Sequence, residues 1–161
     1  MCDASQRKRA IEYFQEAYRH QQSGELEEAI NDYKKSIEIH PTAEAHTFLG
    51  WAYSMLARYD EAIEECLKAI VVDPAFGNPY NDIGAYLIER GQLSQAVPWL
   101  LKAIAAPRYE SRCYPHFNLG RISQRMGRWL EAIQHYENAL QDNPAFADAR
   151  KAIASLRARL N

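Results

Sequence analysis

The sequence contains no long apolar run and few cysteines. A membrane-spanning helix needs about 20 consecutive, predominantly apolar residues, and the 161-residue chain has no such segment. Cys2, Cys66 and Cys113 are odd in number and are not spaced like metal ligands, which argues against a disulfide framework or a metal site. With residue 1 as the native start, the N-terminus also lacks the apolar segment of a signal peptide. We therefore expect a cytoplasmic protein without a membrane partner.

A strong excess of positive charge is also missing. The formal net charge is −2, so nothing in the balance favours nucleic acid as a partner. The charge is unevenly distributed, however. Residues 1–76 carry 14 acidic and 8 basic residues, whereas residues 111–161 carry 4 acidic and 8 basic ones. One end of the folded chain should therefore be acidic and the other basic.

The motifs of common catalytic sites are absent as well. The chain has no phosphate-binding P-loop, no G-x-G-x-x-G sequence and no G-x-S-x-G nucleophile turn. His46 and His116 occupy equivalent positions in repeats that are two copies apart. Packed helices lie about 8–10 Å apart, so these two rings cannot reach one metal ion. We expect no enzyme activity, no cofactor and no metal.

What the sequence does contain is an internal repeat. Leu49-Gly50 returns as Ile83-Gly84 and as Leu119-Gly120, and Ala17 holds the glycine position in a weaker first copy. The steps from position 17 to 50, 84 and 120 are 33, 34 and 36 residues. Further small residues recur in phase, at Ala29, Ala62, Ala96 and Ala132. A period of about 34 with this spacing is the signature of the tetratricopeptide repeat (TPR), and the chain resembles that family over about residues 10–146.

The resemblance implies an all-α fold with one domain over residues 1–161. We expect a TPR α-solenoid of four antiparallel helix hairpins, at about residues 10–42, 43–76, 77–110 and 113–146, forming a right-handed superhelix. A capping helix should follow at 147–160, with Ile153, Leu156 and Leu160 covering the last hairpin. The first helix should run from about Gln6 to Gln22 after frayed residues 1–5, and Asn78 should cap the fifth helix. The junction between the third and fourth copies is two residues longer than the standard one.

Two smaller features concern the packing between helices. Gly50, Gly84 and Gly120 lie inside predicted helices, where glycine costs about 1 kcal/mol, so a neighbouring helix should lie close against each of them. Cys66 occupies the position that other copies fill with Tyr33, Leu100 or Tyr136, and it should be buried.

The first helix of each predicted hairpin carries a stripe of residues at helical spacing, rotated from the stripe that packs against the second helix. This rotated stripe provides the candidate binding residues. In TPR folds this stripe faces a concave groove, and the resemblance is the basis for that orientation here. The predicted partner-binding residues are Tyr18, Trp51, Asn81, Asp82, Asn118, Arg121 and Arg125. Aromatic residues and arginine often anchor interfaces, and asparagine bonds a peptide backbone without reading its sequence. We expect an apolar anchor against the aromatic residues and an acidic group against the two arginines.

One known mode of TPR binding does not fit. TPR domains that hold the acidic tails of heat-shock chaperones use lysines, asparagines and an arginine on three successive first helices. In both possible registers the matching positions lack the cations, and each register contains Asp82, which would repel a carboxylate. The sequence instead favours a non-enzymatic scaffold or adaptor that binds a protein or peptide segment. The alternative is a small TPR chaperone for a secretion or assembly substrate.

Overall fold

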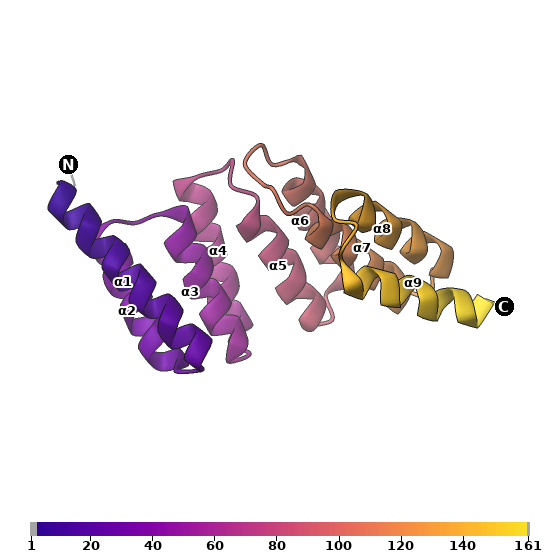
Figure 1. Ribbon diagram of the computed structural model, residues 1–161, viewed down its shortest axis with the longest axis horizontal. Coiled ribbons are helices and arrows are strands. Elements are labelled where there is room, and N and C mark those ends of the chain that lie inside the picture. The colour runs from indigo at the N-terminus through magenta and orange to yellow at the C-terminus, as the bar shows by residue number, and fades with distance from the viewer. Residues whose placement is uncertain (1–2, 161) are drawn as a thin grey trace.

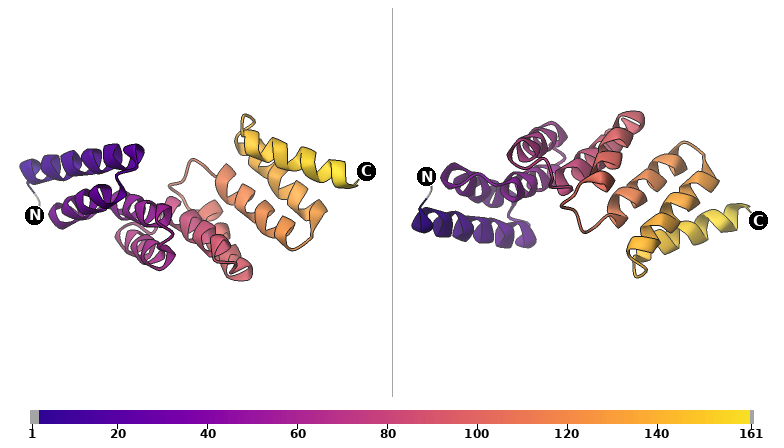
Figure 2. Two further views of the ribbon diagram at one scale, coloured as in Figure 1. Left: turned by 90° about the horizontal axis from the view of Figure 1, so that it is seen from below. Right: turned by 90° about the horizontal axis from the view of Figure 1, so that it is seen from above.

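The computed structural model describes residues 3–160, and this part of the chain forms nine α-helices and no strand (Figure 1). The helices are α1 (Ala4–Ser23), α2 (Leu26–Ile39), α3 (Ala43–Met55), α4 (Tyr59–Val72), α5 (Asn78–Glu89), α6 (Leu93–Ala105), α7 (Cys113–Arg125), α8 (Trp129–Asp142) and α9 (Ala147–Leu160). They stack as successive hairpins with the two ends of the chain at opposite ends of the stack (Figure 2). No helix in residues 3–160 is both long and apolar enough to cross a membrane.

Each hairpin turns at a residue in the left-handed region of backbone space. Gly24, Gly91 and Gly127 have φ of 80°, 76° and 74°, values that glycine adopts without a steric cost. Ala57 has φ of 57° at the same place in the second hairpin. The predicted helical hairpins are therefore confirmed.

Two predicted helix starts were wrong. The first helix begins at Ala4 rather than near Gln6, because Asp3 caps it: the Asp3 Oδ1 accepts from the Gln6 backbone N–H at 2.7 Å, and Gln6 Oε1 accepts from the Asp3 N–H at 3.1 Å. Ala4 and Ser5 are thus helical, while residues 1–2 of the predicted frayed segment lie outside the described residues. Asn78 is the first residue of α5 and not its cap, because Gly77 holds the cap position.

The three helical glycines lie where a neighbouring helix leaves no room for a side chain. A Cβ atom at Gly84 would lie 2.7 Å from the Leu100 Cγ, and one at Gly120 would lie 2.5 Å from the Tyr136 Cε1. At Gly50 the nearest atom would be the Ala62 carbonyl oxygen at 2.9 Å. The predicted close helix contacts are confirmed within all three hairpins.

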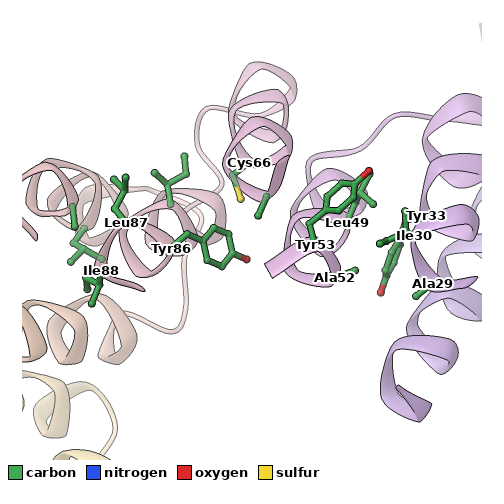
Figure 3. Close-up of a cluster of buried hydrophobic side chains, with 14 of the residues drawn as sticks. Ala29, Ile30, Tyr33, Leu49, Ala52, Tyr53, Cys66, Tyr86, Leu87 and Ile88 are labelled. Atoms are coloured by element: carbon green, nitrogen blue, oxygen red, sulfur yellow. The ribbon is translucent and has the colours of Figure 1, made fainter. Parts of the chain in front are cut away.

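The core of residues 3–160 has two main clusters along the stack and two small ones. The largest runs from α1 and α2 to α7 and includes Cys66, which is fully buried as predicted (Figure 3). The second joins α7, α8 and α9, where Ile153 and Leu156 are buried. The third residue predicted to cover this face was assigned wrongly, because Leu160, in the last turn of α9, is 49% exposed.

The long junction between α6 and α7 folds back over the previous repeat (Figure 1). The Arg108 N–H donates to the Ala75 carbonyl at 3.0 Å, and the Gly77 N–H donates to the Arg108 carbonyl at 3.0 Å. The Arg108 guanidinium also donates to Asp73 at 2.7 Å and to Glu44 at 2.9 Å. These bonds fix the junction against the loop between α4 and α5.

Candidate protein-binding groove

A groove of about 430 Å³ lies between the first helices of three successive hairpins, α3, α5 and α7, and the junction before α7. Five aromatic side chains and one carboxylate line it, together with smaller polar residues. These six are Phe48, Trp51, Asp82, Tyr86, Tyr109 and Tyr114. Its volume lies within the range of about 300–1,000 Å³ that is typical of ligand pockets.

The aromatic walls combine exposed and packed rings. Trp51 on α3 is 39% exposed and Tyr114 on α7 is 50% exposed, so both offer apolar surface to a ligand. Phe48 lies beside Trp51 in an edge-to-face contact with ring centroids 5.8 Å apart. Tyr18 contacts Phe48 at 5.9 Å but does not line the groove. Trp51 therefore lies in the groove, and Tyr18 lies outside it.

The two predicted asparagines pair with each other. The Asn118 Nδ2 donates to the Asn81 Oδ1 at 3.0 Å, and both side chains are buried. Asn81 Nδ2 in turn approaches the Asp82 Oδ1 at 3.3 Å. This chain of contacts joins α7 to α5. Asn81 and Asp82 line the groove, whereas Asn118 does not line it and contacts it through Asn81.

The two predicted arginines connect helices instead of facing the groove. Arg121 pairs with Glu89 on α5 and donates to Asn118 Oδ1 at 3.1 Å. Arg125 donates to the carbonyl of Ile88, near the end of α5, at 2.8 Å. Both arginines border a different hollow, of about 370 Å³, beside Trp129 and Arg159. Trp51 and the two arginines, which were expected to contact one ligand, therefore border two different hollows.

Asp82 is the unusual charge of the groove. Desolvation raises its pKa to about 7, and the hydrogen bond from Asn81 opposes that rise. Within residues 3–160 no cationic side chain forms an ion pair with it. Burial likewise raises the pKa values of Tyr86 and Tyr109, and the nearby Asp82 charge adds to this. The groove therefore holds one carboxylate among neutral, largely aromatic groups.

Sequence reasoning missed Tyr86, Tyr109 and Ser111 as groove residues. Tyr109 comes from the junction, where its ring packs on Gly77: a Cβ there would lie 2.8 Å from the Tyr109 Cδ1. The sequence shows that this junction is longer than the standard one. Its length alone does not show where the extra residues lie, so it did not place Tyr109 in the groove. Tyr86 is buried and reaches the groove beside Asp82.

His46, one of the two histidines in equivalent repeat positions, contacts a glutamate of the neighbouring helix. His46 Nδ1 lies 2.7 Å from the Glu65 Oε2, and both residues are buried. In the part of the chain that the structure describes, no group of three or more histidine, cysteine or acidic residues is placed to hold a metal ion.

Comparison with known proteins establishes the family. Two tetratricopeptide repeat profiles match the chain, one over residues 14–79 and the other over residues 113–146. The chain belongs to the tetratricopeptide repeat family, and its fold is the all-α solenoid of that family. Proteins of this family are generally protein-interaction scaffolds and typically lack enzyme activity.

The Type IV pilus assembly protein PilF of Pseudomonas aeruginosa is 30% identical over 132 residues, which is 81% of this chain and 52% of PilF. This chain therefore spans about half the length of that relative. A solved structure from the functional characterization of P. aeruginosa PilF gives a TM-score of 0.87 at 26% identity, covering 96% of this chain and 70% of that one. The crystal structure of YrrB, described as a TPR protein with an unusual peptide-binding site, gives 0.66 at 26% identity, covering 93% and 77%.

Proposed function

We propose that this chain is a non-catalytic scaffold that binds a segment of a partner protein in the groove between α3, α5 and α7. The observation that carries the proposal is the pair of exposed aromatic side chains, Trp51 and Tyr114, on opposite walls of one groove. Large aromatic residues in concave, partly desolvated positions are frequent anchors of protein interfaces. The description of YrrB as a peptide-binding TPR protein supports this use of the fold.

We further propose that the scaffold serves the assembly of a type IV pilus. The support is the likeness to PilF, whose name describes a pilus assembly protein. A scaffold would remain in the assembled machine, whereas the alternative, a chaperone, would release its substrate when assembly is complete. Fractionation of the assembled machine separates these two, because it retains a scaffold and loses a chaperone.

The test is complementation of a deletion strain of the source organism. Deletion should remove surface pili, and the parent chain should restore them. Trp51→Ala should fail to restore them at equal protein level, whereas Leu67→Ala, which removes an exposed apolar side chain of α4 outside the groove, should succeed. Normal piliation in the deletion strain would refute the pilus role, and restoration by Trp51→Ala would refute the use of the groove in it.

A further inference from the structure

The groove contains a carboxylate, Asp82, that no cationic side chain of residues 3–160 contacts. Asp82 lies on α5 at the centre of the lining, and among residues 3–160 its side chain has one hydrogen-bonding neighbour, the Asn81 amide at 3.3 Å. A half-buried carboxylate without a cation costs free energy, and a ligand cation that pairs with it recovers part of that cost.

The walls around Asp82 suit a cation as well as an apolar group. The faces of tryptophan and tyrosine attract ammonium and guanidinium groups, most strongly where water is excluded. Trp51, Tyr86, Tyr109 and Tyr114 line the same groove as Asp82. The long aliphatic part of a lysine or arginine side chain would contact these rings while its charged end reaches the carboxylate.

The charges outside the groove also favour a positively charged ligand. Residues 1–76 carry an excess of six acidic residues. Arg108, at the rim formed by the junction, is already paired with Asp73 and Glu44. The arginines expected to receive an acidic group, Arg121 and Arg125, are bonded to α5 and lie outside this groove.

We propose that the groove recognises a partner polypeptide by a lysine or arginine side chain that pairs with Asp82 between the aromatic walls. This inference rests on the proposed scaffold function and specifies the chemistry of its partner. The titratable side chains that face Asp82 are Cys66 on α4, Tyr86 on α5 and Tyr109 in the junction, and all three are neutral at pH 7. Because Asp82 has a pKa of about 7, binding should weaken as the pH falls below that value.

The experiment uses the full chain and an array of nine-residue peptides. Their central residue is lysine, arginine, norleucine or glutamate, and the other positions are mixtures without charged residues. At pH 8 the parent should bind the lysine and arginine pools at least about fivefold better than the norleucine pool, a difference that a single charge-assisted contact supports. Lowering the pH to 5.5 should protonate Asp82 and remove this preference, so that the basic and norleucine pools bind equally.

Asp82→Asn and Asp148→Asn are the matched variants. Both remove one carboxylate, but Asp148 lies on α9 outside the groove. The preference for basic pools should disappear in Asp82→Asn and persist in Asp148→Asn, with thermal unfolding showing that both fold. Equal binding to all pools, preference for the glutamate pool, absence of binding, or a preference that Asp82→Asn retains would each overturn the inference. Binding of free putrescine in place of the peptides would also overturn it, because the ligand would then be a small amine.

A separate measurement distinguishes a failure of this inference from a failure of the proposed scaffold function. If Trp51→Ala releases the natural partner while Asp82→Asn does not, the groove is the binding surface and the inference about the cation is wrong. If neither variant releases it, the scaffold proposal for this groove is wrong.

Discussion

At the scale of single residues, Asp82 couples the groove to pH. Its pKa in the folded chain is about 7, against an ordinary value of 3.8. Below pH 3.8 the group is protonated in both folded and unfolded chains and costs nothing. Between these values the folded chain keeps a proton that the unfolded chain loses, so rising pH lowers the free energy of unfolding until the pH passes 7.

Asp82→Asn should therefore stabilise the chain at pH 8 and have little effect at pH 4. One pKa unit corresponds to about 1.36 kcal/mol, which sets a ceiling of about 4 kcal/mol, and water in the open groove reduces the gain to about 1–3 kcal/mol. Urea unfolding at several pH values measures it, with Asp148→Asn as the control. A stability difference that does not change between pH 4 and pH 8 would contradict the account.

Gly84 tests the packing between the helices of one hairpin. Gly84→Leu places a side chain where Leu100 already lies, so we expect destabilisation of about 1–3 kcal/mol from overpacking. The control is Gln95→Leu, which adds a similar side chain at an exposed position of α6. An unchanged urea midpoint for Gly84→Leu would show that the helices are not held together at this point.

At the scale of elements, α9 protects the last hairpin. Ile153 and Leu156 cover α8, and without them an apolar face would be exposed to water. Truncation after Asn143 should produce self-association, measured by sedimentation at increasing protein concentration. Arg157→Ala, which removes an exposed ion pair with Glu137 from the same helix, should leave the chain monomeric. A monomeric truncated chain with the parent melting temperature would refute the capping role.

The junction before α7 lines the groove alongside α3, α5 and α7. Gly77→Ala would add a Cβ against Tyr109, and because φ at Gly77 is −79° the backbone itself tolerates alanine. We expect the junction to lift and the Arg108 amide, which donates to Ala75, to exchange its hydrogen faster. Amides of α1 should be unaffected. Unchanged protection at Arg108 would mean that the Tyr109 contact does not hold the junction.

The junction before α7 also shows which features of the fold the sequence did not predict. The helices were predictable because small and apolar side chains recur with one period, and each hairpin is a local unit. The path of the junction depends on Arg108 reaching Asp73 and Glu44, which are 35 and 64 residues away in the chain. The prediction that Arg121 and Arg125 face the binding groove rests on the resemblance to TPR folds and on their place along one helix. Their partners on α5 follow from how adjacent hairpins pack, which the spacing within one helix does not record.

At the scale of the whole molecule, the chain is a stack that displays one groove across its middle repeats. The groove joins side chains from three hairpins and the junction, so its shape depends on how these hairpins pack against one another. The handedness of the superhelix and the cytoplasmic location stay predictions. The central claim is that this groove, and not the outer face of the second helices, binds the partner.

The most direct test of that claim is to measure association and dissociation rates by surface-plasmon resonance, using the partner that co-purifies with this chain. Loss of a buried aromatic anchor acts mainly on dissociation, so Trp51→Ala should raise the off-rate, with a loss of about 2 kcal/mol or more if Trp51 is a hot spot. Leu67→Ala, on the outer helix α4, should bind like the parent. If Trp51→Ala folds normally and dissociates at the parent rate while Leu67→Ala dissociates faster, the partner binds the outer face and the central claim is contradicted.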